Sequence, residues 1–229
     1  MSKKYYAIIT AGGLGTRMGG NVAKQFLEIG GKPIIVHTIN NFLSLSFPVE
    51  IILVLPSGFK DYWKRYCLEN DFVFKHTLVS GGITRFHSVK NALKYVEKGG
   101  VVAVHDGVRP FASVDFLEEM FNAADTFPAV IPVIKPSDSI RQLTNNGSII
   151  INREELVMIQ TPQIFHSDIL LDSYNTAYKS EFTDDASVVE NSGNTIHLVQ
   201  GRKINIKITE PQDLIFAEGI LNASLQMKV

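Results

Sequence analysis

The chain has 229 residues, of which 45% are hydrophobic and 20% are charged, and its formal net charge is -1. This length suits one large α/β domain, 1–229, with a sizeable buried core. The balanced charge excludes a general basic surface of the kind that holds nucleic acid, so an anionic substrate must be bound by a local cluster of lysine and arginine.

The N-terminus and the cysteine content predict a cytoplasmic protein that does not bind membranes. After the basic start, only the run 5–10 is apolar, which is too short for a secretory signal, and no stretch approaches the length of a membrane span. Cys67 is the only cysteine, so no intrachain disulfide can form. We expect Cys67 to be an inert residue of a helix.

Apolar runs alternate with helix-periodic segments along most of the chain. Strands are expected at 5–10, 49–55, 72–79, 101–105, 129–134 and 195–199. Helices are expected after Pro33, after Gly82, and at 114–124, 167–178 and 211–225. This alternation predicts an α/β fold, a Rossmann-like three-layer sandwich whose mostly parallel sheet carries helices on both faces. Such sheets bind ligands at the carboxyl ends of their strands.

One stretch departs from the alternation. The β-like runs 139–143 and 148–152 flank Asn145-Asn146-Gly147, and Asn-Gly between two such runs is a strong hairpin signal. We therefore expect a protruding β-hairpin arm, residues 136–158, within the single domain.

The first chemical signal is a glycine-rich loop directly after the first strand. It runs Ala11-Gly12-Gly13-Leu14-Gly15-Thr16-Arg17-Met18, and Lys24 follows seven residues after Arg17. Glycines let the backbone present N–H groups to phosphate oxygens, and the two cations suit a triphosphate. The loop is neither a Walker motif nor a dinucleotide fingerprint, because Met18 stands at the third glycine position. The alternative interpretation is an ordinary turn with solvated charges.

Three further segments carry candidate residues. Gly82 and Ser88 flank a helix start, which attracts anions. Asp106 follows a buried strand, where a parallel sheet places a substrate-binding carboxylate, and Arg109 either pairs with it or binds phosphate. Lys207 lies in an apolar-flanked segment that we interpret as an edge strand, and it either points to the same site or is solvated.

In combination these motifs resemble the methylerythritol phosphate cytidylyltransferase family of the non-mevalonate isoprenoid pathway. The resemblance covers nearly the whole chain, with its motifs in the family's order. Besides the loop and segments above, it includes Gln160-Thr161-Pro162-Gln163, Thr183-Asp184-Asp185-Ala186, Gly201-Arg202 and Asn205-Ile206-Lys207.

The resemblance implies transfer of the cytidylyl group of CTP to a polyol phosphate, with Mg²⁺ held mainly by the CTP phosphates, and a homodimer formed through the arm. It implies three catalytic residues, Arg17, Lys24 and Lys207. It implies a CTP-binding set of Ala11, Gly12, Gly13, Gly15, Gly82, Ser88 and Asp106. It implies an acceptor-binding set of Asp106, Arg109, Ser139, Arg153 and Thr161.

Three positions depart from the family pattern. Ser139 stands where threonine is usual, Ala23 where proline is common, and Ile83 where an acidic residue is frequent. Thr183-Asp184-Asp185 is interpreted as a helix N-cap rather than as part of the site. The six histidines show no metal-ligand spacing, so none is assigned to a metal.

Other functions remain open at this point. A ribitol 5-phosphate cytidylyltransferase shares the opening loop, but Asn152-Arg153-Glu154 and Asp184-Asp185-Ala186 favour 2-C-methyl-D-erythritol 4-phosphate as acceptor. A nicotinamide-dependent oxidoreductase would require the complete dinucleotide fingerprint. A non-catalytic nucleotide-binding module would not need Arg17, Lys24 and Lys207 together.

Overall fold

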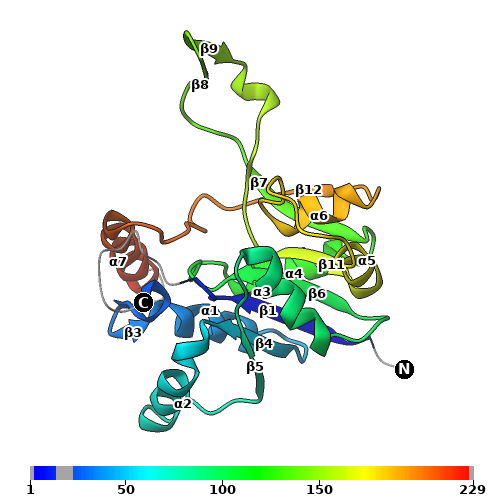
Figure 1. Cartoon of the computed structure of the whole chain (residues 1–229). Helices are drawn as coiled ribbons and strands as arrows, with labels where there is room; N and C mark the ends of the chain where they lie inside the picture. Colours follow the sequence, from blue (N-terminus) through cyan, green and yellow to red (C-terminus); the bar gives the residue numbers. More distant parts are fainter. Residues whose placement is uncertain (1–2, 14–22, 227–229) are drawn as a thin grey trace.

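A computed structural model describes residues 3–13 and 23–226, and an eight-stranded sheet lies at the centre of this part of the chain (Figure 1). Its strands are β1 (Tyr5–Thr10), β4 (Glu50–Leu55), β5 (His76–Ser80), β6 (Val101–Asp106), β7 (Ala129–Ile134), β10 (Met158–Ile159), β11 (Gln163–His166) and β12 (His197–Gln200). The strands follow the order β10-β7-β11-β6-β1-β4-β5, and β12 pairs with β7. Strands β6, β1, β4 and β5 are parallel, as β7 and β12 are, while β10 and β11 run antiparallel to their neighbours.

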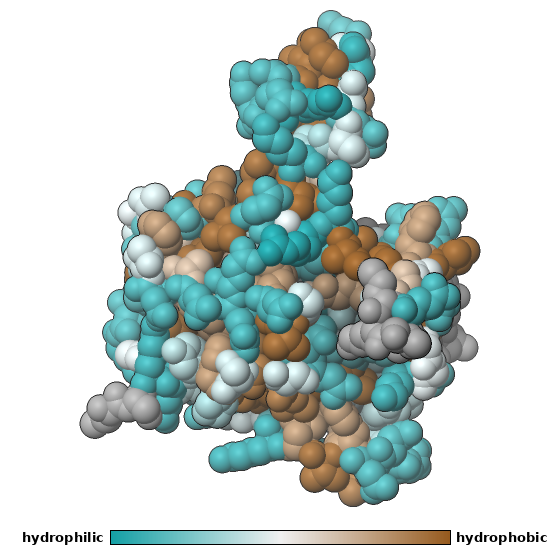
Figure 2. All heavy atoms as spheres, turned by 180° about the vertical axis from the view of Figure 1, so that it is seen from behind, coloured by the Kyte–Doolittle hydropathy of each residue, from teal (hydrophilic) through white to brown (hydrophobic). Residues whose placement is uncertain are grey.

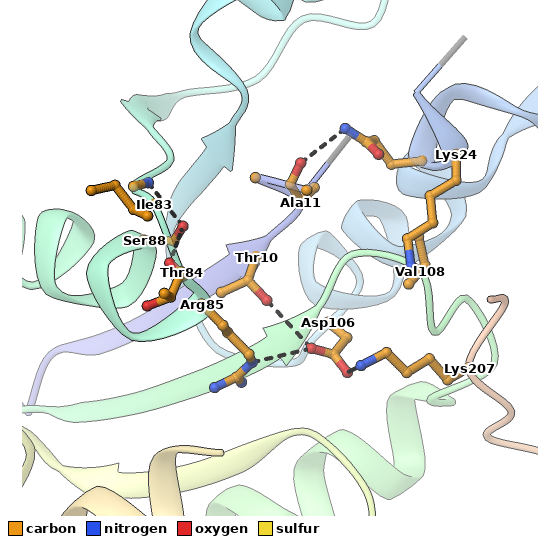
Figure 3. Close-up of a pocket in the computed structure, with 14 residues that line it drawn as sticks. Thr10, Ala11, Lys24, Ile83, Thr84, Arg85, Ser88, Asp106, Val108 and Lys207 are labelled. Carbon is orange, nitrogen blue, oxygen red and sulfur yellow. Dashed lines mark hydrogen bonds and ion pairs between the residues drawn. The ribbon is translucent and has the colours of Figure 1, made fainter. Parts of the chain in front are cut away.

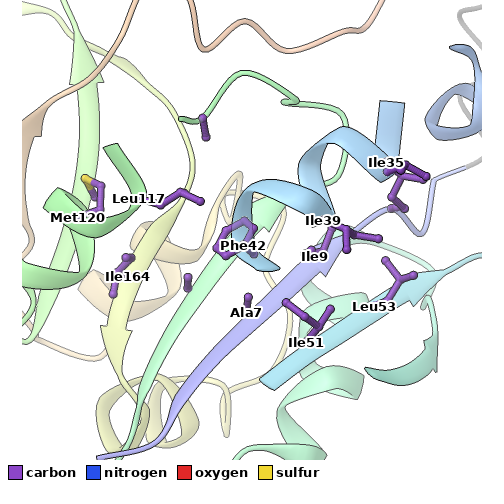
Figure 4. Packing of buried hydrophobic residues seen from close by; sticks show 14 of the residues in the cluster. Ala7, Ile9, Ile35, Ile39, Phe42, Ile51, Leu53, Leu117, Met120 and Ile164 are labelled. Atoms are coloured by element: carbon purple, nitrogen blue, oxygen red, sulfur yellow. The ribbon is translucent and has the colours of Figure 1, made fainter. Parts of the chain in front are cut away.

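Helices cover both faces of the sheet because successive strand residues point in opposite directions. In β1, Ala7 and Ile9 pack with the helices α1 (Ile34–Leu43), α2 (Lys60–Glu69) and α4 (Val114–Ala123), and Figure 4 shows this cluster. Tyr6 and Ile8 pack on the other face with α3 (Arg85–Ala92), α5 (Ser167–Ser173) and α6 (Asp185–Asn191). The expected Rossmann-like three-layer arrangement is confirmed.

The last helix, α7 (Pro211–Gln226), packs beyond the sheet beside the short hairpin of β2 (Glu28–Ile29) and β3 (Lys32–Pro33). Its Ala217 belongs to a small buried cluster with Ile29, Ile34, Val108 and Ile208. The backbone N–H of Ile208 donates to the carbonyl of Val108 at 3.0 Å. This cluster fixes the segment that carries Lys207 beside the end of β6.

Several elements differ from the expectation. Strand β5 begins at His76 rather than near Phe72, because Phe72 and Phe74 turn their rings onto Trp63 instead of extending the sheet. Helix α5 ends at Ser173, earlier than expected, and Lys207 lies in an irregular segment rather than an edge strand.

Cys67 lies in α2, and burial raises the pKa of its thiol to about 11, so it is an unreactive helix residue as expected.

The predicted hairpin is present and stands away from the sheet (Figure 1). Within the described residues, strands β8 (Ile140–Thr144) and β9 (Gly147–Ile151) pair only with each other, and Thr144 faces Gly147 across a two-residue turn. The hairpin exposes large apolar side chains, with Leu143 84% and Ile150 65% exposed, and Figure 2 shows hydrophobic atoms on its surface.

Among the described residues, no helix combines the length and apolar character that a membrane span requires.

Candidate active site

A hollow of about 260 Å³ opens at the carboxyl ends of the parallel strands (Figure 3). The end of β1, two glycine turns and the first turn of α3 form its walls, and Lys24 and Lys207 reach it from outside the sheet. Its described lining is Thr10, Ala11, Gly12, Gly13, Lys24, Gln25, Gly82, Ile83, Thr84, Arg85, Ser88, Asp106, Val108 and Lys207.

The two glycine turns approach each other closely. A Cβ on Gly12 would lie 3.3 Å from the Cα of Gly81, and a Cβ on Gly81 would lie 3.1 Å from the Cα of Gly12. A Cβ on Gly82 would lie 2.4 Å from the Cβ of His87, so this position accepts only glycine without a shift. The glycines therefore let two backbone turns meet at the wall of the hollow.

Helix α3 begins beside this contact. The Thr84 side chain caps the helix by accepting from the backbone N–H of His87. The hydroxyl of Ser88 accepts from the N–H of Gly82 and donates to the carbonyl of Thr84, each at 3.0 Å. Ser88 thus fixes the second glycine turn against the helix instead of facing solvent.

Asp106, the last residue of β6, is surrounded by three cationic side chains. Lys207 Nζ lies 2.9 Å from Oδ2, Arg109 Nε lies 3.5 Å from Oδ2, and Arg85 Nε lies 3.6 Å from Oδ1. Figure 3 shows Arg85 and Lys207 approaching the carboxylate from opposite sides. Burial alone would raise the pKa of Asp106, but Arg85, Lys207 and Arg109 hold this pKa well below its usual range. The carboxylate is therefore ionised at neutral pH.

A second hollow of about 200 Å³ lies on the other side of this group. Arg85, Asp106 and Lys207 line both hollows, so they form the wall between them. The rest of its described lining is Arg109, Ile159, Gln160, Thr161, Gln163, Thr183 and Asp184. Two adjacent polar hollows that share a charged wall suit two anionic substrates that react with each other.

Buried hydrogen bonds hold the second hollow in place. The hydroxyl of Thr161 accepts from the backbone N–H of Asp106 at 3.1 Å and lies 3.1 Å from Nδ1 of His105. His105 Nε2 lies 3.1 Å from the carbonyl of Arg109, and because a carbonyl only accepts, Nε2 carries the proton. Nδ1 then accepts from Thr161. Arg109 donates from Nη1 to the carbonyl of Asn205 at 2.8 Å, so much of this side chain is engaged inside the protein.

The structure brings together most of the residues singled out in the sequence. The following line one or both hollows: Ala11, Gly12, Gly13, Lys24, Gly82, Ser88, Asp106, Arg109, Thr161 and Lys207. Gly15 and Arg17 lie outside the described residues. Ser139 and Arg153 are exposed on the arm and are not among the described residues that line either hollow. Arg153 instead donates to the carbonyl of Ser137 at 2.6 Å.

The sequence did not single out Arg85, which lines both hollows. Its position in the first turn of α3, shortly after Gly81 and Gly82, is the sequence feature that could have identified Arg85 as a site residue. Asp184 caps α6 through the N–H of Ser187, as expected from the sequence, but Thr183 and Asp184 also line the second hollow, which the sequence interpretation did not expect. Asp185 is completely buried and bonds to Arg85, a contact across one hundred residues that no local pattern reveals.

The charged groups fit magnesium held chiefly by substrate phosphates. Among the described residues, no three His, Cys, Asp or Glu side chains gather as a ligand set. Asp106 is the one acidic side chain in the described lining of the first hollow, and it is ionised. Mg²⁺ in nucleotide sites commonly takes most of its ligands from substrate phosphates and water, and the oxygens of Asp106 already contact cationic side chains.

The fold and this site define a nucleotide-binding α/β enzyme. Residues 5–223 match the family model described as 2-C-methyl-D-erythritol 4-phosphate cytidylyltransferase, IspD, and the chain belongs to this family. A relative of that name from Phocaeicola vulgatus is 48% identical over 94% of this chain and 99% of its own, and one from Bacteroides thetaiotaomicron is 45% identical over 95% and 100%.

Solved structures agree with this assignment. The 4-diphosphocytidyl-2C-methyl-D-erythritol synthase from Anaerococcus prevotii superposes with a TM-score of 0.81 at 30% identity, covering 96% of this chain and 99% of its own. The 2-C-methyl-D-erythritol 4-phosphate cytidylyltransferase from Francisella tularensis gives a TM-score of 0.80 at 27% identity over 95% and 100%. The family resemblance inferred from the sequence is confirmed.

The buried histidine makes stability depend on pH. Burial lowers the pKa of His105 from 6.5 to about 4, so between these values the unfolded chain binds a proton that the folded chain does not. The free energy of unfolding should therefore decrease as the pH falls through this window. We expect His105→Gln to show a shallower decrease than the wild type, by about 2 kcal/mol between pH 7 and pH 5. Urea unfolding at both pH values measures this difference.

The other histidines are the same in both proteins, so their titration cancels in the comparison. Asp106 loses its contribution only as the pH falls below its ordinary pKa of 3.8, outside the chosen range. Parallel pH profiles for the two proteins would show that His105 is not buried in its neutral form.

Proposed function

We infer that the chain transfers the cytidylyl group of CTP to 2-C-methyl-D-erythritol 4-phosphate, giving 4-diphosphocytidyl-2-C-methyl-D-erythritol and pyrophosphate. The observation that carries this inference is the charged wall of Arg85, Asp106 and Lys207 shared by two adjacent hollows. The family and its relatives are named for this activity, which favours methylerythritol phosphate over ribitol 5-phosphate as acceptor. Membership in a transferase family gives no support to a nicotinamide-dependent oxidoreductase or a non-catalytic module.

The first hollow suits CTP. Its glycine turns bring backbone against the ligand, and the N-terminus of α3 offers N–H groups and a positive dipole. We assign the cytosine to the turns at Gly12 and Gly82, with Ser88 holding the second turn. Ile83 is 95% exposed at the edge of this hollow and offers no polar group from its side chain. The triphosphate then extends toward Lys24 and Lys207.

The reaction is an in-line displacement. A phosphate oxygen of the acceptor attacks the α-phosphorus of CTP, an O–P bond forms, and the bond to the β-phosphate breaks as pyrophosphate leaves. The nucleophile is already an anion, so the enzyme needs no strong base. Its task is to hold two anions together and to stabilise the charge of the transition state. We assign this task to Lys24 and Lys207, and to Arg17 on the basis of the sequence resemblance.

We propose Mg²⁺ as the cofactor, which would be held mainly by the CTP phosphates. When bound, the ion neutralises phosphate charge and orients the triphosphate. The chain's own groups position the acceptor: Thr161 and Arg109 line the second hollow, and Asp106 orients Lys207 at the boundary between the hollows. A cytoplasmic location stays a prediction from the sequence.

The activity is tested by pyrophosphate release. Purified protein with magnesium is given CTP and either 2-C-methyl-D-erythritol 4-phosphate or ribitol 5-phosphate, and ATP, GTP and UTP replace CTP in parallel reactions. We expect turnover with CTP and methylerythritol phosphate, and a lower kcat/KM for every other pair. A higher kcat/KM with ribitol 5-phosphate would assign the acceptor to the sister activity, and equal turnover with a purine triphosphate would refute the cytosine site.

Lys207 is the described catalytic candidate with the clearest geometry. Removing its charge with Lys207→Ala should lower kcat by roughly a hundredfold, the scale seen for a lost transition-state donor. The matched control is Lys203→Ala, because Lys203 is an exposed lysine of the same irregular segment that lines neither hollow. We expect the control to keep full activity. A folded Lys207→Ala protein with wild-type kcat would show that the ion pair with Asp106 is only structural.

We further propose a homodimer formed through the arm. A two-stranded hairpin is at best marginally stable alone in water, yet β8 and β9 pair with no other strand that the structure describes. Leu143, Ile149 and Ile150 are more than half exposed, as an interface would require. In such a dimer Arg153 and Ser139 of one chain would reach the acceptor phosphate in the site of the other, which accounts for their distance from the site within one chain.

Subunit mixing tests the shared site. Arg153→Ala and Lys24→Ala proteins, each inactive alone, are combined under conditions that allow subunit exchange. Each heterodimer then holds one site in which both residues are wild type, so activity should recover. Failure to recover after exchange is confirmed, or a fully active monomer, would refute the shared site. The control is a mixture of Lys24→Ala and Lys207→Ala, which should stay inactive because both residues belong to the body of the same chain.

A further inference from the structure

Asp185 is a completely buried carboxylate behind the site. It lies in the first turn of α6, where Gln163 Oε1 accepts from the backbone N–H groups of Asp185 and Ala186, each at 3.0 Å. Tyr174 donates its hydroxyl to Oδ1 at 2.6 Å, and Arg85 Nη2 lies 2.6 Å from Oδ2. Each carboxylate oxygen therefore has its own hydrogen-bond partner. Tyr174, Arg85 and Gln163 together fix the position of Asp185.

Arg85 lies between this carboxylate and the one in the site. Its Nη2 makes a short hydrogen bond to Asp185, whereas its Nε is 3.6 Å from Asp106, beyond hydrogen-bond distance. Its side chain is 27% exposed and lines both hollows. Arg85 is therefore held by Asp185 on one side, while its side chain lines the two hollows on the other.

The two carboxylates compete for one guanidinium. Arginine beside a single carboxylate tends to form a bidentate pair with two parallel hydrogen bonds. If Arg85 paired in this way with Asp106, its guanidinium would compete with Lys207, which now bonds to Oδ2 of Asp106 at 2.9 Å. The stronger contact to Asp185 prevents this collapse.

We propose that Asp185 is a positioning residue for the reaction: it holds Arg85 open toward the substrate phosphates and leaves Asp106 to Lys207. Tyr174 supports this role by fixing the second oxygen of Asp185. The proposal rests on the proposed cytidylyl transfer, since the groups being positioned face the substrates of that reaction. The alternative is an ion pair that only joins α3 to α6.

The experiment is a double-mutant cycle between Asp185→Asn and Arg85→Met. Asparagine keeps the shape but not the charge, so Asp106 becomes the stronger partner of Arg85. We expect kcat to fall by roughly 10- to 100-fold, the scale for a misplaced supporting group, with a KM for CTP within roughly threefold of wild type. In the Arg85→Met background, Asp185→Asn should cause no further fall, because Asp185 acts through Arg85.

The matched control is Asp172→Asn, which makes the same change on α5 at an exposed aspartate paired with the exposed Lys98. We expect it to keep wild-type kcat and KM. Thermal unfolding of every variant separates loss of stability from loss of positioning. Wild-type kcat in a folded Asp185→Asn protein, or losses that multiply fully in the double variant, would overturn the proposal in favour of a purely structural ion pair.

Tyr174→Phe provides a second route where Asp185→Asn fails to fold. The ring, stacked on Phe86, stays in place while Asp185 loses one of its hydrogen bonds, and we expect a several-fold fall in kcat. Unchanged kcat in this variant would overturn the proposal. If the wild type itself releases no pyrophosphate, the proposed function fails and the positioning role that rests on it fails with it, whereas wild-type kcat in a folded variant overturns the positioning role alone.

Discussion

The ionised carboxylate of Asp106 is the constraint on which the rest of the site depends. A carboxylate that is 7% exposed at the end of a central strand is stable only when cations surround it. Those cations come from three separate parts of the chain, at Arg85, Arg109 and Lys207. Helix α3, the loop after β6 and the segment before α7 must therefore all be in place before Asp106 can be buried, so folding and assembly of the site are one process.

The same interaction sets the charge that the site offers to its substrates. The three cations contact Asp106, and Arg85 also contacts the second carboxylate, Asp185. This cluster of three cations and two carboxylates therefore has a net charge of +1. That excess is small beside a triphosphate and an acceptor phosphate. The free protein avoids a large unpaired charge in this way, and the proposed reaction would draw further positive charge from groups outside this cluster.

Local sequence patterns predict the layers of the fold but not the contacts between distant segments. The runs at β1, β6 and β7 are continuous and apolar because both faces of these strands are buried, so they were recognisable without the structure. Strand β11 was not recognisable, because it has four residues and starts with Gln163, a polar side chain that is buried only because it binds the start of α6. Arg85 and Asp185 were missed for a similar reason: each looks like a surface residue of a helix start until the other is placed beside it.

The arm raises the question of where the remaining positive charge for the acceptor comes from. Arg109 lines the second hollow, but its Nε faces Asp106 and its Nη1 bonds to Asn205, so two of its three nitrogen atoms are already engaged. Arg153 is about half exposed and bonds only to one backbone carbonyl and weakly to the neighbouring Glu154 among its described contacts. Its guanidinium retains donors for a bidentate phosphate contact.

An arginine that keeps this capacity has to be held away from the carboxylates of its own site, and a hairpin that stands clear of the sheet achieves this separation. The proposed shared site fits the electrostatics that govern Asp106: cations packed into the body are neutralised there, whereas Arg153 on the arm keeps donors for an anion.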